Sequence, residues 1–202
     1  MTEDARAGAS SFRRELARKA IHLSSTAVPI ALSLGIGRRI SLFLLGALAL
    51  IAVAVEVSRA MSPVAASRFA ALFQPLLRSH ESTRLTGATW LIGSMFGAVL
   101  LLPRDAAIVA TWAAAVGDTA AALVGMRFGR RRASYDGKSL EGSVACLLAT
   151  LAGALLLARL GVGVALVAAC AAALGERIPW PHDDNVRIIA AVGIAVMMAM
   201  AP

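Results

Sequence analysis

The chain has 202 residues, of which 58% are hydrophobic and 16% charged, and its formal net charge at pH 7 is +8. The apolar share exceeds the roughly 45–50% of ordinary soluble domains, and the charged residues cluster between apolar runs, so the composition excludes a separate soluble domain. Anionic lipid headgroups and an anionic solute account for the surplus of positive charge, with no need for nucleic acid as a partner.

Seven apolar segments of 16 to 21 residues are candidate membrane spans, since about 20 helical residues cover a hydrocarbon core about 30 Å thick. They cover residues 20–37, 40–57, 85–102, 106–126, 143–160, 162–178 and 186–201. The predicted fold class is therefore all-α, a polytopic integral membrane helical bundle of about seven transmembrane helices. We expect residues 1–11 to be a disordered leader and residues 12–202 to form a single transmembrane domain. The charged leader runs straight into the first span, which we expect to serve as an uncleaved anchor.

The basic residues predict the orientation of this bundle. With the N-terminus in the cytoplasm, sixteen of the 20 lysines and arginines lie in inner segments, and only Arg38, Arg39, Arg104 and Arg159 lie in outer ones. Inner segments of membrane proteins carry such an excess of positive charge. The three histidines and nearly all acids fall on the same side. We therefore expect an integral protein of the cell membrane whose active site faces the cytoplasm.

The segment at about 64–77 differs from the spans because apolar and basic residues alternate in it at helical spacing. This pattern predicts an amphipathic helix that lies on the inner leaflet and roofs a lipid entrance. A plain connector explains the segment equally well. Cys146 and Cys170 lie within predicted spans without metal-like spacing, and we interpret them as inert packing thiols.

Asp118 stands inside an apolar span, where a carboxylate costs about 2.5–3.5 kcal/mol on insertion scales and is rarely idle. It could bind the magnesium ion of a nucleotide or take the proton of an attacking alcohol. Lys138 could hold a phosphate as a point charge. A structural pair between Asp118 and a lysine or arginine is the alternative. Gly137-Lys138-Ser139 imitates the end of a P-loop, but Arg132 occupies the required earlier glycine position.

Small residues recur at every fourth position around Asp118 and would form one smooth stripe on a helix. They are Gly117, Ala121, Gly125 and Gly129. Close packing against another helix explains the stripe. The other interpretation is that it lets a phosphate approach the backbone beside Asp118.

Further polar groups on the inner side could converge with Asp118. Helical offsets place four side chains of the leader on one face: Glu15, Arg18, Lys19 and His22. Glu56 and Arg59 could pair with each other, and a dense polar patch from His80 to Trp90 opens the third span. The last inner loop, with Glu176 and the Asp183-Asp184-Asn185 run, is interpreted either as a second metal-binding arm or as a turn.

These motifs resemble those of the CTP-dependent lipid kinases, which include dolichol kinase, phytol kinase and the yeast-type diacylglycerol kinase. The central pattern comprises Gly117, Asp118, Ala121, Gly125 and Gly129, followed by Lys138, Ser139, Glu141, Gly142 and Ser143. The supporting elements, in the same order along residues 15–190, are Arg18, Lys19, His22, Glu56, Arg59, Thr86, Gly87, Trp90, Glu176, Asp184 and Asn185. The chain has no additional N-terminal spans like those of dolichol kinases, so small bacterial polyprenol kinase-like or phytol kinase-like activity is the better match.

The resemblance implies transfer of the γ-phosphate of CTP to a membrane lipid alcohol, with Mg²⁺ or another divalent ion. It implies catalytic roles for Asp118, Lys138, Glu141 and Glu176, with Asp118 and Asp184 organising the metal. The implied substrate- or nucleotide-binding residues are Arg18, Lys19, His22, Glu56, Arg59, Thr86, Trp90, Gly117, Gly125, Gly129, Arg130, Arg131, Ser139, Gly142, Ser143 and Asn185.

Two other functions remain open from the sequence. A CTP:phosphatidate cytidylyltransferase shares the acid, the glycines and the Lys-x-x-Glu-Gly motif, but its characteristic C-terminal stretch does not occur after Gly142. A lipid carrier or small transporter would favour paired repeats and polar residues on both sides of the membrane, whereas polarity here lies on one side. The motifs name neither the lipid alcohol nor the oligomeric state.

Overall fold

A computed structural model describes residues 15–74, 76–77, 81, 84–131, 138–178 and 183–201. These residues form helices joined by turns, with no β-strand in the part of the chain that the structure describes, so the all-α prediction is confirmed. The predicted leader at residues 1–11 lies outside the described residues, as do His80, Arg132 and residues 179–182.

The helices follow one another with short connections. Residues 15–23 are helical and continue through the 3-10 turn η1 (Ser24–Thr26) into α2 (Ala27–Ser33). The remaining elements are α3 (Arg38–Met61), α4 (Pro63–Phe73), α5 (Gly87–Leu101), α6 (Arg104–Trp112), the π-helical turn η3 (Ala113–Gly117), α7 (Asp118–Phe128), α8 (Leu140–Leu156), α9 (Val162–Arg177) and α10 (Asp184–Met200). α6, η3 and α7 form one continuous helix.

Each predicted apolar segment coincides with one of these helical stretches, and the predicted amphipathic helix corresponds to α4. Among the residues that the structure describes, two helices are long and apolar enough to cross a membrane: Arg38–Met61 and Arg104–Phe128. α5 and α8 are apolar but shorter. Length and composition therefore support two crossings, while the complete seven-span topology remains a prediction.

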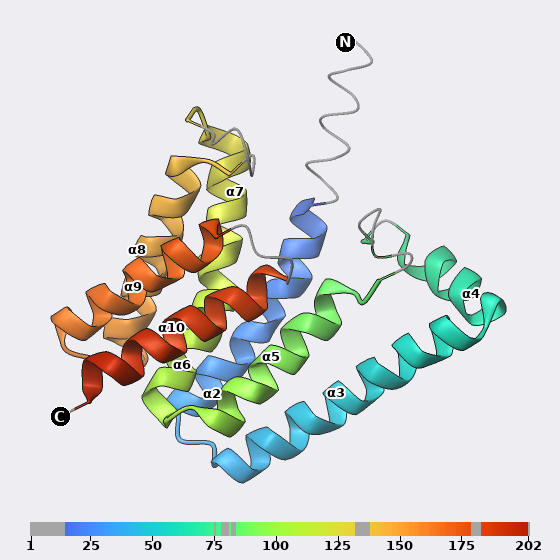
Figure 1. Ribbon diagram of the computed structural model, residues 1–202, viewed down its shortest axis with the longest axis horizontal. Coiled ribbons are helices and arrows are strands. Elements are labelled where there is room, and N and C mark those ends of the chain that lie inside the picture. Colours follow the sequence, from blue (N-terminus) through green and yellow to red (C-terminus); the bar gives the residue numbers. More distant parts are fainter. Residues whose placement is uncertain are drawn as a thin grey trace.

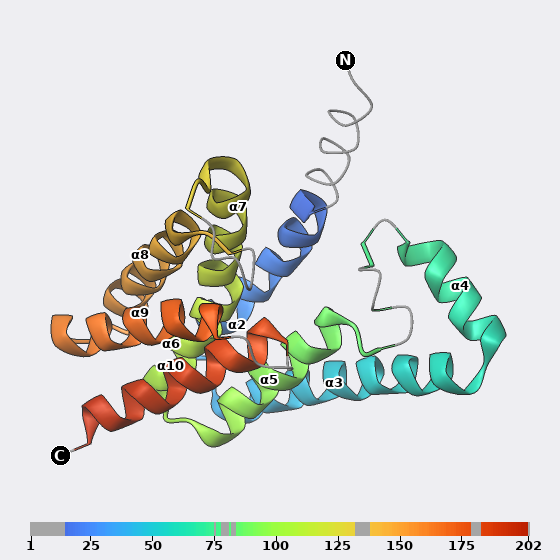
Figure 2. The same ribbon diagram turned by 45° about the horizontal axis from the view of Figure 1, so that its top comes forward.

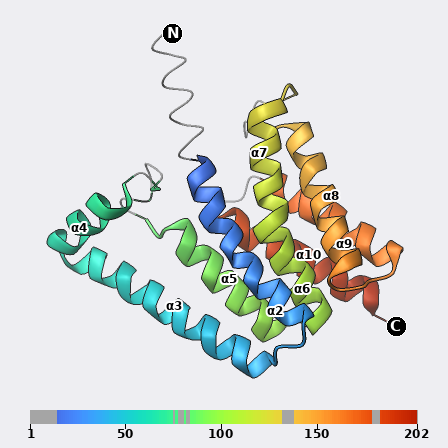
Figure 3. The ribbon, with the colours of Figure 1, turned by 180° about the vertical axis from the view of Figure 1, so that it is seen from behind.

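The continuous α6–η3–α7 helix lies at the centre of the bundle, with α2, α5, α8 and α10 around it (Figure 1 and, from behind, Figure 3). Many of its core contacts are made by alanine, which allows close approach of helices. α3 lies at the edge, packed on α5, and α4 turns away from its end (Figure 2). In the most apolar stretch of α3 only 11% is buried, whereas in that of the central helix 67% is buried. The apolar residues of α3 are therefore much more exposed than those of the central helix.

One tight contact in this core gives a prediction about packing. The indole of Trp112 lies over Gly153 and its Nε1 donates a hydrogen bond of 2.8 Å to the carbonyl of Ala149. A Cβ at Gly153 would overlap the indole ring. We expect Gly153→Ala to lower the free energy of unfolding by about 1–3 kcal/mol, as overpacking does. Thermal unfolding in detergent micelles measures the change.

The control is Gly93→Ala on α5, where a Cβ would meet nothing within 4 Å. Alanine is the better helix former, so this variant should match or slightly exceed the wild type in melting temperature. Equal melting temperatures for the two variants would contradict the packing described at Trp112.

Candidate active site

A cavity of about 640 Å³ lies between the N-terminal helix, α3, α4, α5 and the start of α10. Its wall along α3, α4 and α5 is apolar, with residues such as Leu48, Phe73 and Met95. One end of the cavity is polar, where the N-terminal helix, the last turns of α3 and the starts of α5, α7 and α10 meet. It carries Arg18, Lys19, His22, Glu56, Glu81, Thr86, Thr89, Asp118, Asp183, Asp184 and Asn185. The cavity is therefore amphipathic, and polar groups from five separate segments of the chain meet at its polar end.

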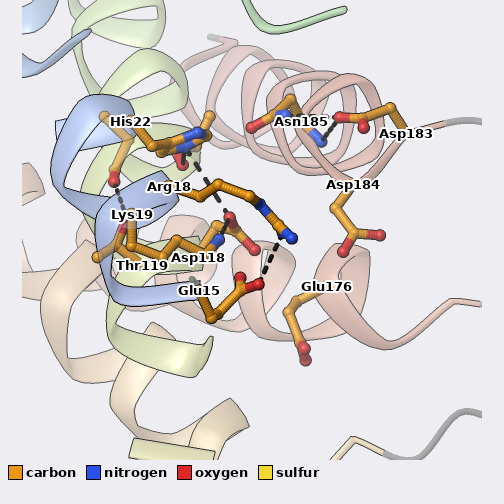
Figure 4. Close-up of polar contacts among 12 residues, drawn as sticks. Glu15, Arg18, Lys19, His22, Asp118, Thr119, Glu176, Asp183, Asp184 and Asn185 are labelled. Carbon is orange, nitrogen blue, oxygen red and sulfur yellow. Dashed lines mark hydrogen bonds and ion pairs between the residues drawn. The ribbon is translucent and has the colours of Figure 1, made fainter. Parts of the chain in front are cut away.

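Asp118 is the first residue of α7 and faces Lys19 of the N-terminal helix (Figure 4). The Lys19 ammonium donates a hydrogen bond to Asp118 Oδ2, and His22 Nε2 lies 3.9 Å from the same oxygen. Lys19 is only 6% exposed and Asp118 only 7% exposed. A buried carboxylate requires such a partner because an unpaired buried charge is strongly destabilising. The predicted convergence of Lys19 and His22 with Asp118 is thus present in the structure.

A π-helical turn directly before Asp118 sets the direction of this carboxylate. The N–H of Asp118 donates to Ala113 O, five residues back, so the carbonyl of Ala114 is passed over. His22 occupies that carbonyl, with Nε2 at 2.9 Å from Ala114 O. Because a carbonyl only accepts, this contact assigns the proton of the imidazole to Nε2. Single π-turns inside α-helices are frequent at functional sites, and the sequence pattern gave no signal for this one.

A second polar cluster joins the end of α9 to the start of α10. The Lys138 ammonium donates to the backbone carbonyl of Glu176 and lies 3.2 Å from Glu176 Oε1 and 3.3 Å from Asp184 Oδ2. Ser143 Oγ donates to Glu176 Oε2 at 3.1 Å. Asp184 is also paired with Arg187. Figure 4 shows Glu176 and Asp184 on the side of the site toward which Arg18 extends.

A third network holds the start of α5. Glu56 Oε1 accepts hydrogen bonds of 2.9 Å from the backbone N–H and the hydroxyl of Thr86 and from the hydroxyl of Thr89. Arg59 donates to Glu56 Oε2 and to the carbonyl of Glu81, both at 2.6 Å. Glu56 and Arg59 therefore pair, as one prediction had it. The Glu56 carboxylate also supplies an acceptor for an N–H group that the helix N-terminus leaves without a partner.

The glycine stripe faces α8. A Cβ at Gly117 would meet Thr150 Oγ1 at 2.9 Å, and one at Gly125 would meet Ser139 Oγ at 3.0 Å. Gly142 of α8 lies against the carbonyl of Ala121, where a Cβ would come within 2.7 Å. The geometry supports the interpretation as close helix packing. Approach of a phosphate to the stripe would require α8 to move, so a direct binding role for Gly117, Gly125, Gly129 and Gly142 gains no support.

Several other predicted residues lie beside the cavity and do not line it. Ser139 caps α8 by accepting a hydrogen bond of 3.0 Å from the N–H of Gly142. The Glu141 carboxyl accepts hydrogen bonds from the backbone N–H of Glu141 itself and from those of Arg130 and Arg131, and these bonds lower its pKa. The contacts with Arg130 and Arg131 hold the segment after α7 against α8. Arg130 and Arg131 are exposed, and Trp90 is half-buried on α5. Glu141 therefore has a positioning contact here, and its predicted catalytic role stays a prediction.

The oxygen donors of the cavity fit an ion that arrives with a nucleotide. Among the described residues, no three His, Cys, Asp or Glu side chains are grouped to hold a metal. Mg²⁺ bound with phosphates needs only one or two carboxylates, and Asp118 and Asp184 both line the cavity. Asn185 adds a buried Oδ1 that has no hydrogen-bond partner in the described part of the chain. Asp183 is engaged otherwise, because its Oδ1 accepts from the backbone N–H of Asn185 at 3.0 Å and caps α10.

Comparison of the chain with protein-family models, with curated proteins and with solved structures gave no match. The class of the site is therefore defined by its geometry: a buried, cation-neutralised carboxylate at the polar end of a cavity whose other walls are apolar.

Proposed function

We propose that the protein is a CTP-dependent kinase that transfers the γ-phosphate of CTP to the hydroxyl group of a membrane lipid alcohol. The observation that carries the proposal is the amphipathic cavity, with apolar walls on α3, α4 and α5 and Asp118 at its polar end. The apolar walls suit a hydrocarbon tail, and the polar end suits a hydroxyl group. The choice of CTP as donor and of a polyprenol- or phytol-like alcohol rests on the motif resemblance.

In this proposal the chain is an integral membrane protein with seven spans and a cytoplasmic N-terminus. The exposed apolar surface of α3 supports contact with lipid, since a large exposed apolar surface is rare on soluble monomers. The site lies at the end of the bundle that carries most of the positive charge, where the exposed Arg130 and Arg131 are placed to meet anionic headgroups.

The proposal gives a role to each charged group. Asp118 orients the attacking hydroxyl and takes its proton as the oxygen–phosphorus bond forms and CDP leaves. Lys19 and Arg18 line the cavity and supply positive charge for the transferred phosphate. Lys138 holds the carboxylates of Asp184 and Glu176 where the end of α9 meets the start of α10. Asp118, Asp184 and Asn185 Oδ1 would hold Mg²⁺, which supplies further neutralisation of the phosphate oxygens.

The test is an assay of the purified protein in detergent with Mg²⁺, γ-labelled CTP and a panel of lipid alcohols, with phosphatidic acid alongside. We expect label in a lipid alcohol, release of CDP, and poor substitution of CTP by ATP. Pyrophosphate release with phosphatidic acid, and no labelled lipid, would identify a cytidylyltransferase and overturn the proposal.

The contact between His22 and the π-turn gives a prediction for the same assay. His22→Ala removes the donor to Ala114 O, so Asp118 loses its fixed position and kcat should fall about 100-fold, the effect of a misplacement near 1 Å. His22→Gln retains an N–H donor and should recover most of the loss. Steady-state kinetics of both variants measure the difference. A wild-type kcat in His22→Ala would show that the contact does not position Asp118.

A further inference from the structure

A second cavity of about 620 Å³ lies in the angle between α3 and α4. Its floor is apolar and includes Ala54, Val64 and Ala65. Its edge is polar, with Ser58, Arg59, Ser62 and Arg68. Three residues line this cavity and the site cavity alike: Ile51, Val55 and Phe69. The two spaces are therefore neighbours, separated by the side chains of α3 and α4 at these positions.

Phe69 is the largest group in this wall, and its ring is held on two sides. The guanidinium of Arg59 stacks over the ring at 4.3 Å from its centre, and the ring of Phe73 lies 4.7 Å away. Arg59 is itself bound to Glu56 and to the carbonyl of Glu81. The wall is thus fixed by the same network that holds the start of α5 at the site.

The occupant of the second cavity follows from its continuity with the site. Its apolar floor accepts hydrocarbon, and it borders α3, a helix whose apolar residues are mostly exposed. The polar edge lies beside the C-terminal end of α3, where Arg59 and Ser62 stand, so hydrocarbon would run along Ile51 and Val55.

We propose that the cavity between α3 and α4 takes the distal end of the lipid alcohol's tail, and that Phe69 sets the tail length that the protein accepts. This inference rests on the proposed function and deepens it by naming a residue that determines specificity. A short tail ends in the site cavity, whereas a longer one has to pass Phe69 to reach the second cavity.

Two substitutions at this position act in opposite directions. Phe69→Ala joins the two cavities and should raise the ratio of kcat/KM for long over short isoprenoid alcohols by about tenfold, the scale of discrimination for a few carbons in an apolar pocket. Phe69→Trp should lower that ratio. The matched control is Leu72→Ala on the same helix, because Leu72 is 73% exposed and lines neither cavity. Its chain-length profile should equal that of the wild type.

The measurement uses the full chain in detergent, γ-labelled CTP and all-trans isoprenoid alcohols of increasing length. Binding of the same alcohols, read as displacement of an alcohol with a fluorescent tail, reports the same selectivity without turnover. Absence of label in every alcohol would overturn the proposed kinase function, and the binding profile would still decide the role of Phe69. Identical profiles for the wild type and Phe69→Ala, in turnover or in binding, would overturn the inference.

Discussion

Asp118→Asn is expected to lower kcat by about 10²–10⁴-fold, the contribution of a positioned general base. The amide keeps the size of the side chain and its place beside Lys19, but it cannot take the proton of the attacking hydroxyl. The substrate-binding walls on α3 and α5 stay in place, so KM for the lipid alcohol should change little. Transfer of label from γ-labelled CTP to the alcohol measures the loss.

This variant also bears on the alternative that Asp118 is only half of a structural ion pair. Removing its charge leaves the Lys19 ammonium buried without an ionised partner, which costs on the order of 3–5 kcal/mol when a buried pair is broken. The double variant Lys19→Met/Asp118→Asn removes both charges and should recover much of the lost thermal stability. We expect no recovery of kcat.

The comparison of stability with activity separates the two roles of Asp118. A structural pair predicts that activity returns together with the melting temperature in the double variant. A catalytic carboxylate predicts a stable and inactive protein. Turnover near the wild-type level in the double variant would therefore remove Asp118 from the chemistry and leave the site without its central group.

Features that depend on neighbouring residues could be predicted from the sequence. Helical stretches follow from apolar runs, and several helices begin where a polar residue caps them, as at Ser62-Pro63, Thr86, Ser139 and Asp183. The offsets within the leader placed Lys19 and His22 on one face, and both side chains do meet Asp118. The amphipathic pattern of residues 64–77 likewise corresponds to α4, which ends earlier, at Phe73, and contributes Phe69 and Phe73 to the lining of the cavity.

Features that depend on distant pairing could not be predicted in this way. Asp118 could equally have been paired with Lys138 by charge alone, and packing of the N-terminal helix against η3 selects Lys19. The π-turn has no composition of its own, because alanine and glycine suit an α-helix as well. The sequence left two interpretations of the glycine stripe open, namely packing against another helix and approach of a phosphate. The position of α8 against the stripe favours helix packing. The wall at Phe69 requires the angle between α3 and α4, which no local pattern specifies.

Lys138→Ala is the second substitution with a large expected effect. The ammonium of Lys138 holds three acceptors at once, namely the carbonyl and carboxylate of Glu176 and the carboxylate of Asp184. Without it, two carboxylates face each other across the start of α10, and a phosphate loses a nearby cation. We expect kcat/KM for CTP to fall by at least about 100-fold, the scale of one preorganised electrostatic contact.

Two companion variants show which part of this loss is due to charge on phosphate. Lys138→Arg keeps the positive charge but spreads it over a planar group, so it should recover stability more fully than activity. Lys138→Ala/Glu176→Gln removes the buried carboxylate that the lysine neutralises and should restore the melting temperature alone. Because Glu176 also accepts from Ser143, the glutamine retains a partner in that variant. Recovery of kcat/KM for CTP in the double variant would assign Lys138 to the packing of α9 against α10, and phosphate binding would then fall to Arg18 and Lys19.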